Sequence, residues 1–458
     1  MDIRFRREAL RRGRGGFRPQ DKGDGAQSRQ AETGGLILSN RDHPEVLVIG
    51  AGIAGMEASL LLSRAGKKVY LVERTSYTGG NSIRCEEVFT NMECATCMLS
   101  PRQQELIQDP NIELLTLSEV EKVERFEGGY KVSVRKRAGY VDPLACIGCG
   151  ACYDPCPVSV PNEFEMGLSQ RKAIFIPVAG ALPNIPVIDT SICLRFEGEE
   201  CQLCKEACVF EAIDFGQEDL LLDFEVGAII VATGFDTMDP GGVPSLSIIS
   251  GVYTAFEFER MFASNGPTEG DIVLDDGKPP RSAAIIHCVG REEVGYCSAV
   301  CCLYSIKFTH YLRSKVPDIE ILELHSGLCL PNKSDQRFCQ RMTSSTDMVR
   351  MENVEISQGD PILVRYDENG EMKERSVDMV ILAPAMVPAE RSEDLARILQ
   401  IETDRRGFFK ERNGVQSSQD GIYVVGCAQG PMDQGGSVSQ ALAAVGEILA
   451  RRRLEQDD

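Results

Sequence analysis

The chain has 458 residues, enough for two or three domains, and 43% of them are hydrophobic, as in a globular protein with a core. The formal net charge of −20 argues against general nucleic-acid binding, and no apolar run approaches the roughly 20 residues of a membrane-spanning helix. Eighteen cysteines without a secretory h-region predict a cytoplasmic protein with metal or redox chemistry, not a disulfide framework.

Residues 1–43 are expected to form a mobile basic tail. Seven arginines lie within the first 20 residues, against Asp2 and Glu8, and Gly, Gln and Ser are frequent in the residues that follow. Such a composition offers too little apolar surface for a packed core. A start codon assigned too far upstream, or an organelle transit peptide, would explain the same pattern.

Residues 45–73 have the pattern of a dinucleotide-binding βαβ unit. Strands are predicted over 45–50 and 68–72, on either side of a helix over 54–65. The turn between the first strand and the helix reads G-A-G-I-A-G, a G-x-G-x-x-G motif in the context that this motif requires. The sequence therefore predicts a bound adenine dinucleotide.

The motif residues have separate expected roles. Gly50 permits the tight turn, Gly52 lets the backbone approach a pyrophosphate, and Gly55 allows close contact between helix and strand. The N-terminus of the helix offers N–H groups to the phosphates, and Glu73 is placed to accept the ribose hydroxyls. The cofactor contacts predicted in this part of the chain are Gly50, Gly52, Ile53, Ala54, Gly55, Glu73, Arg74 and Gly80.

Two later segments favour FAD over NAD. Asp223–Gly234 is predicted as one strand, and Gly421–Asp433 as a strand followed by a small-residue helix over 437–450. Here the chain resembles the flavoprotein disulfide reductases with two dinucleotide-binding domains, in which such segments complete the FAD domain. The usual aspartate is Cys427 in this chain, so Asp433 or a backbone amide would serve the flavin side. The resemblance implies further contacts from Ala232, Thr233, Gly234, Gly426 and Asp433.

Eight cysteines between residues 146 and 208 fall into two groups. The first has the spacing C-x2-C-x2-C-x3-C-P of bacterial ferredoxins, and the second has a longer first gap with the same C-x2-C-x3-C ending. Zinc also takes four thiolates, but this spacing is not a common zinc pattern. We therefore predict two [4Fe–4S] clusters, held by Cys146, Cys149, Cys152, Cys156, Cys193, Cys201, Cys204 and Cys208.

The two groups are expected to exchange their last ligands. In a two-cluster ferredoxin the fourth thiolate of each run reaches across to the other cluster. Cys208 is therefore assigned to the cluster of the first group, and Cys156 to the cluster of the second. Cys193 departs most from the pattern, because residues 194–200 lengthen its loop.

A second α/β domain, starting with a strand over 282–288, lacks a G-x-G-x-x-G at the expected turn. Thiols follow this strand instead and precede a helix that is predicted to run through Arg313. The nicotinamide site therefore looks degenerate, and the thiols could hold a third [4Fe–4S] cluster, with a buried thiol or a redox disulfide as the alternative. The candidate ligands are Cys288, Cys297, Cys301 and Cys302.

Cys94 and Cys97 form a C-x2-C shortly after the first βαβ unit. Such a pair could exchange electrons with a flavin as dithiol and disulfide. It could equally supply two ligands to a cluster that Cys85 or another subunit completes. The residues leave both interpretations open.

The combination of motifs resembles the A subunit of heterodisulfide reductase over about residues 44–455. The segments that carry the resemblance are G-A-G-I-A-G-M-E-A, Y-T-G-G-N, M-E-C-A-T-C-M-L-S-P, the ferredoxin run, H-C-V-G-R, Y-C-S-A-V-C-C and A-Q-G-P-M-D. The resemblance implies a flavoprotein that relays electrons between FAD, clusters and partner subunits of the B and C type. It also leaves a homodimer open.

The expected fold is α/β, a flavoprotein with two dinucleotide-binding domains and an inserted two-cluster ferredoxin domain. Residues 44–138, 217–245 and 386–455 are expected to form the FAD domain, 139–216 the ferredoxin domain and 246–385 the second dinucleotide-binding-like domain. An NAD(P)H-dependent oxidoreductase of the glutamate synthase small-subunit type is the alternative function. A scaffold whose clusters only hold the fold together is a third.

Overall fold

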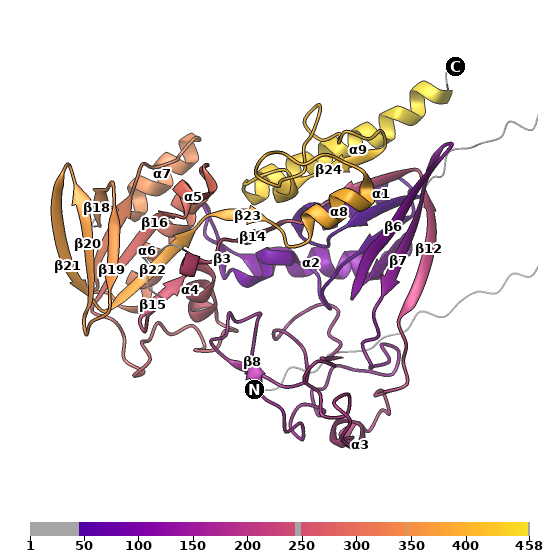
Figure 1. Cartoon of the computed structure of the whole chain (residues 1–458), viewed down its shortest axis with the longest axis horizontal. Coiled ribbons are helices and arrows are strands. Elements are labelled where there is room, and N and C mark those ends of the chain that lie inside the picture. The colour runs from indigo at the N-terminus through magenta and orange to yellow at the C-terminus, as the bar shows by residue number, and fades with distance from the viewer. Residues whose placement is uncertain (1–44, 243–248, 345, 457–458) are drawn as a thin grey trace, which may run out of the picture. The chain divides into compact units, whose positions relative to one another are not determined.

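Two five-stranded parallel sheets organise the protein (Figure 1). The computed structural model describes residues 45–456 except 243–248 and 345, so the predicted basic tail lies outside the described residues. These residues all belong to one compact unit. No helix in this part of the chain is both long and apolar enough to span a bilayer.

The first sheet draws its strands from three distant parts of the chain. Neighbouring parallel strands are joined by crossover connections, so strands that are adjacent in this sheet can be far apart in the sequence. In spatial order the strands are β24 (Ile422–Val424), β13 (Ala228–Val231), β1 (Val46–Ile49), β2 (Val69–Val72) and β5 (Ile112–Leu115).

Both faces of the first sheet are covered, which explains why β1 is apolar along its whole length. Val46 and Val48 of β1 belong to a core shared with three helices, and Leu47 and Ile49 to a core on the opposite face. The helices are α1 (Ile53–Arg64), α2 (Ala95–Gln108) and α9 (Gln434–Gln456). The opposite face packs on the antiparallel strands β6 (Ser118–Phe126), β7 (Gly129–Lys136) and β12 (Leu220–Val226), and on α8 (Ser392–Leu399).

The single strand predicted over 223–234 is wrong. Two strands, β12 and β13, occupy this segment and meet at Gly227. β12 pairs with β7 and alternates between exposed and partly buried residues, whereas every residue of β13 is buried. The change from alternating to continuous apolar residues at Gly227 marks the boundary.

The second sheet has the same three-layer plan. Helices α4 (Ala255–Phe262) and α6 (Cys301–Lys315) pack on one face, and a three-stranded antiparallel sheet packs on the other. The predicted α/β class with two dinucleotide-binding domains is confirmed by this repetition. The sheet contains β15 (Val252–Thr254), β22 (Met379–Pro384), β16 (Ser282–Val289), β17 (Glu320–His325) and β18 (Asp347–Arg350), and its cover contains β19 (Val354–Ser357), β20 (Ile362–Glu368) and β21 (Glu371–Val377).

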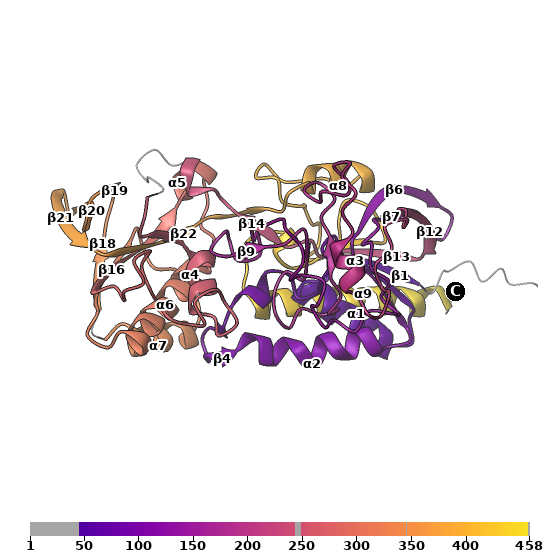
Figure 2. The same cartoon turned by 90° about the horizontal axis from the view of Figure 1, so that it is seen from below.

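Short elements join the two sheets. β14 (Phe235–Thr237) pairs with β23 (Met386–Pro388), so the chain leaves and re-enters the first part through one antiparallel pair. α5 (Arg291–Val294) and α7 (Lys333–Met342) lie beside the second sheet, and β4 (Glu93–Cys94) leads directly into α2 (Figure 2).

The ferredoxin-like segment is inserted between β7 and β12, which pair with each other. Its helices and strands are short and bury few apolar side chains. Cysteines therefore make up a large part of its core, beside aliphatic residues. Its elements are β8 (Val160–Pro161), β9 (Gln170–Arg171), β10 (Ile174–Phe175), β11 (Val187–Ile188) and α3 (Leu203–Ala207).

Candidate functional site

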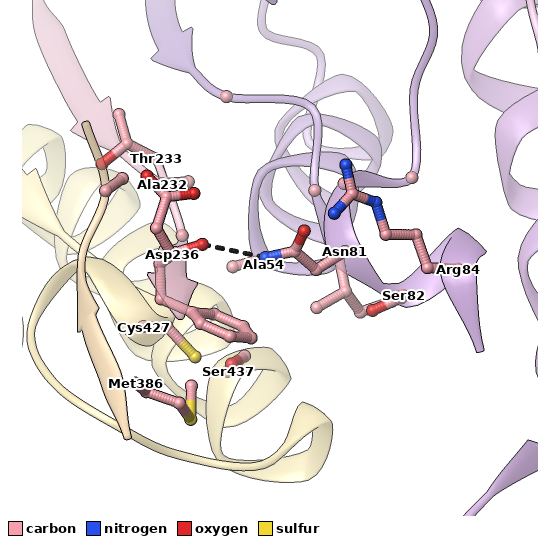
Figure 3. A pocket seen from close by; sticks show the side chains of 18 of the residues that line it. Ala54, Asn81, Ser82, Arg84, Ala232, Thr233, Asp236, Met386, Cys427 and Ser437 are labelled. Carbon is pink, nitrogen blue, oxygen red and sulfur yellow. Dashed lines mark hydrogen bonds between the residues drawn. The ribbon is translucent and has the colours of Figure 1, made fainter. Parts of the chain in front are cut away.

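A cavity of about 450 Å³ lies where the strands of the first sheet end (Figure 3). Its lining includes Gly50 after β1, Glu73 after β2 and Ala232 after β13. Ligands of parallel α/β sheets bind at this edge, and the volume is that of an ordinary ligand site. Every predicted cofactor-binding residue lines this cavity except Gly55 and Gly426.

The motif glycines shape the cavity floor. A Cβ on Gly50, whose φ is 104°, would lie 2.4 Å from the carbonyl oxygen of Ala232, and one on Gly55 would lie 1.8 Å from that of Gly50. Gly55 therefore acts by packing beneath the turn. A Cβ on Gly52 would meet nothing closer than Gly80 Cα at 4.0 Å, and no side chain caps the helix at Gly52. The first N–H groups of α1 are thus open to a phosphate.

Two polar groups of the cavity fit a dinucleotide. The carboxylate of Glu73 accepts hydrogen bonds from Ala51 N at 2.7 Å and from Thr75 N at 2.8 Å, which fixes it at the end of β2. Among the described residues Oε2 accepts only the bond from Ala51 and keeps a lone pair for a ribose hydroxyl, whereas Oε1 also accepts from the Thr75 hydroxyl at 2.8 Å. The hydroxyl of Thr233 is buried and has no hydrogen-bond partner among the described residues. A bound ligand would satisfy this orphaned group.

The segment after β24 lines this cavity with Cys427 and Asp433. Cys427 stands after Gly426 and donates a hydrogen bond to the Met432 carbonyl at 3.3 Å, while burial raises the pKa of its thiol. Asp433 accepts a hydrogen bond from Gly436 N at 2.7 Å and so caps α9. Opposite them, Asn81 donates to the Phe235 carbonyl at 2.8 Å (Figure 3).

Sequence reasoning missed a buried ion pair at the cavity wall. Lys307 of α6 and Glu259 of α4 are in contact, and both side chains line the cavity although they are almost fully buried. Lys307 also donates to the Glu87 carbonyl at 2.8 Å. The available signal was the spacing of Leu303, Lys307 and Tyr311, which puts a lysine on an apolar helix face.

The insert gathers the second predicted ligand set. Cys193, Cys201 and Cys204 line one small cavity together with Cys156, the residue predicted to reach across from the first run. Burial, together with the nearby Cys193, Cys156 and Cys201, raises the pKa of the Cys204 thiol to about 11. Hydrophobic side chains, among them Ile174, complete the lining.

The first predicted set lies next to it. Burial raises the pKa of the Cys152 thiol to about 12, with additional effects from Cys204, Cys146 and Cys208. Cys149 is exposed, whereas Cys152 is buried. Nowhere in the described chain do three or more His, Cys, Asp or Glu side chains converge as a single metal ion requires. A cluster instead bonds each thiolate to a different iron, so its ligands surround a volume.

The third cysteine group runs from the end of β16 to the first turn of α6. Arg291 is hydrogen bonded to Cys288, and this thiol raises the pKa of the guanidinium together with Cys297 and Cys301. The pKa of Cys302 is lowered because Cys301 donates a hydrogen bond to it and His287 lies beside it. All four candidate ligands therefore lie in one neighbourhood.

A fifth thiol, that of Cys329, lies beside this group. The sequence did not predict this neighbour. Its backbone N–H donates to Cys302 Sγ at 3.4 Å, and its own pKa is raised by burial and by Cys297. The Met238 side chain packs against the turn that would carry the phosphates of a nicotinamide cofactor, since a Cβ on Gly290 would lie 2.1 Å from Met238 Sδ.

Cys94 and Cys97 form a disulfide at the N-terminus of α2. β4, which ends at Cys94, pairs with β3 (Glu87–Val88), and β3 lines the large cavity. Cys85, two residues before β3, is a free thiol in the same lining, and burial raises its pKa to about 12. The free thiol of Cys85 thus precedes β3 in the chain, and the disulfide follows it at the end of the neighbouring strand β4.

Comparisons with family models identify two segments. Residues 45–133 match the model of FAD dependent oxidoreductases, and residues 140–161 match the 4Fe–4S binding domain. Among solved structures, a thioredoxin reductase from T. acidophilum aligns with 12% identity and a TM-score of 0.49, covering 90% of this chain and all of that one.

The chain is similar in sequence to several proteins named as, or for their likeness to, heterodisulfide reductase A subunits. The A subunit of the H(2):CoB-CoM heterodisulfide,ferredoxin reductase of Methanothermobacter thermautotrophicus is 35% identical over 87% of this chain and 62% of its own length. A protein of Archaeoglobus profundus that is named for its likeness to the heterodisulfide reductase A subunit is 36% identical over 89% of this chain and 66% of its own. The iron–sulfur A subunit of the CoB–CoM heterodisulfide reductase of Methanocaldococcus jannaschii is 36% identical, over 88% and 63%. The chain thus spans a little under two thirds of these relatives.

Proposed function

Because the chain belongs to the family of heterodisulfide reductase A subunits, we propose that it is the FAD- and [4Fe–4S]-containing electron-transfer subunit of a heterodisulfide-reductase-like complex. The observation that carries the proposal is the grouping of cysteines in the inserted segment, where the last cysteine of the first run lies with the second run. Cys156 shares a cavity with Cys193, Cys201 and Cys204, the arrangement in which two ferredoxin runs exchange ligands.

The residues of the large cavity would hold FAD. The Gly50–Gly55 turn and the start of α1 would bind the pyrophosphate, Glu73 the ribose, and the orphaned Thr233 hydroxyl a polar atom of the cofactor. FAD exchanges electrons in pairs and each cluster exchanges them singly, so the protein's part is to hold these groups and to set their potentials.

We assign the cysteine ligands of each cluster from the spacing of the cysteines in the sequence and from which cysteines lie close together in the structure. One cluster would bind Cys146, Cys149, Cys152 and Cys208, and the other would bind Cys156, Cys193, Cys201 and Cys204. A third would bind Cys288, Cys297, Cys301 and Cys302, with Cys329 as a neighbouring thiol.

The domain division, partners and location are part of the same proposal. The FAD domain comprises residues 44–138, 217–245 and 386–455, the ferredoxin domain 139–216 and the second dinucleotide-binding-like domain 246–385. The partners would be subunits of the B and C type in the cytoplasm, and a homodimer of this chain is compatible with the family.

Cofactor analysis of protein purified without oxygen tests the proposal. We expect one FAD and about 12 iron atoms per chain if three clusters are present, or about eight if only two are. Cys156→Ser should lose about four iron atoms. Cys339→Ser, which removes a thiol of α7 outside the assigned sets, should lose none. Flavin without iron would contradict the proposal.

The nicotinamide alternative predicts a different result. If NADPH were the direct donor, it would bleach the flavin of the isolated protein within seconds. The missing G-x-G-x-x-G, the Met238 side chain packed on Gly290 and the thiols that follow it favour a protein whose flavin NADPH does not reduce.

A further inference from the structure

The disulfide between Cys94 and Cys97 is placed at the surface, not in a core. Cys97 is exposed, Cys94 is partly buried, and the neighbouring Met98 keeps 45% of its surface exposed. The two cysteines are only three positions apart, so the bond closes a very short loop. Such a short loop constrains the unfolded chain little, so a purely stabilising role explains the bond poorly.

The two sulfur atoms are not equivalent. Cys94 is the N-cap residue of α2, and its Sγ accepts a hydrogen bond from Cys97 N at 3.1 Å. A helix N-terminus and an N–H donor both favour a thiolate over a thiol. Cys94 is therefore the better leaving group, and the exposed Cys97 is the sulfur that an incoming thiolate can reach.

We infer that Cys94 and Cys97 form a thiol–disulfide exchange site for the dithiol of a partner protein. This activity goes beyond the proposed electron transfer and does not require bound FAD or iron. The exposed thioether of Met98 offers an apolar contact for the partner's surface beside the reacting sulfur.

The exchange balances without a further reductant. A partner thiolate attacks Cys97 Sγ, the bond between Cys97 and Cys94 breaks, and Cys94 leaves as a thiolate. The partner's second thiolate then attacks its own sulfur in the mixed disulfide and releases Cys97. Two electrons pass to this chain, the partner becomes a disulfide, and the two protons of the partner dithiol end on Cys94 and Cys97.

The position of the pair links this site to the large cavity. Cys94 pairs with Glu87 of β3, whose N–H donates to Tyr311 Oη at 3.0 Å and whose carbonyl accepts from Lys307 at 2.8 Å. Opening the disulfide would therefore change the support of β3, the strand that α6 holds at the cavity wall.

The test uses the whole protein with its cofactors, prepared without oxygen, and reduced thioredoxin in excess as the probe. After quenching, alkylation at Cys94 and Cys97 is measured on peptides by mass spectrometry. We expect alkylation of both residues to rise at least ten-fold over untreated protein, with matching oxidation of thioredoxin. A pair that stays disulfide-bonded under these conditions would be a structural link, which overturns the inference.

Two variants separate the remaining explanations. Met98→Gln should slow exchange with thioredoxin several-fold and leave exchange with dithiothreitol unchanged; equal slowing of both would contradict protein docking here. Cys94→Ser/Cys97→Ser should keep the iron and flavin contents of Cys339→Ser. Loss of about four iron atoms from the double variant would instead identify the pair as cluster ligands and overturn the inference.

Discussion

Lys307 and Glu259 form an ion pair in the wall of the large cavity, with side chains that keep only 1% and 4% of their surface exposed. Burial raises the pKa of Glu259, and Lys307 opposes this effect. The pair joins α6 to α4, and through the Glu87 carbonyl it also holds β3. Two helices of the second domain thus contribute charge to a cavity whose floor belongs to the first.

Lys307→Met should destabilise the protein by about 3–5 kcal/mol, because it leaves the Glu259 carboxylate buried without its ion-pair partner. The measurement is denaturant unfolding of the variant and the parent protein. Lys307→Met/Glu259→Gln should recover part of the loss, since no uncompensated charge remains. Lys410→Met is the matched control: it breaks an exposed pair with Glu402, which water screens, and should cost far less stability than Lys307→Met. Equal losses for Lys410→Met and Lys307→Met would show that burial of the pair is unimportant.

Gly55→Ala should disrupt the FAD turn, since the added methyl would lie 1.8 Å from the carbonyl oxygen of Gly50. Relieving such overpacking costs about 1–3 kcal/mol and displaces the turn that faces the cofactor. Flavin content and the apparent FAD affinity report the effect. Gly446→Ala, in α9 with no atom within 4 Å of the new Cβ, should instead stabilise its helix by about 0.5–1 kcal/mol. Full retention of FAD by Gly55→Ala would contradict the assigned role.

Thr233→Val should weaken FAD binding and leave the cofactor-free protein at least as stable. The hydroxyl of Thr233 has no partner among the described residues, so its removal costs the empty protein no hydrogen bond. A lost bond to the cofactor of about 1 kcal/mol corresponds to roughly five-fold weaker binding. Titration of the flavin-free protein with FAD measures this difference, and unchanged affinity would place the hydroxyl away from the ligand.

Glu163→Gln should destabilise the insert in a way that depends on pH. A hydrogen bond from Arg171 lowers the pKa of Glu163, so the folded protein binds the proton more weakly than the unfolded chain. The stability from this carboxylate is fully present above its unfolded pKa of about 4.3 and is lost as the pH falls through the lower folded value. The gap in melting temperature between parent and variant should therefore close on acidification. A gap that widens would mean that the folded protein binds this proton more tightly than the unfolded chain, which contradicts the prediction.

The predicted resemblance to the heterodisulfide reductase A subunit is confirmed by relatives at 35–36% identity. The glycine turn after β1 was predictable because its determinants are local: Gly50, Gly52 and Gly55 act through the backbone of one turn. The ferredoxin runs were predictable because each cluster needs thiolates at short, fixed spacings. The strand boundary at Gly227 was missed because the partly exposed strand β12 runs into the buried strand β13 with only Gly227 between them.

Residue order alone is enough to specify the motifs of this chain: a glycine turn, two cysteine runs and a thiol-filled second site. Packing in three dimensions brings Cys329 to Cys302, sets Lys307 against Glu259, and places Cys94 one strand away from the cavity. The first two contacts join residues 27 and 48 positions apart, and the third depends on strand pairing, so no local spacing encodes them. They follow from how the helices and strands bury their apolar faces over the whole chain.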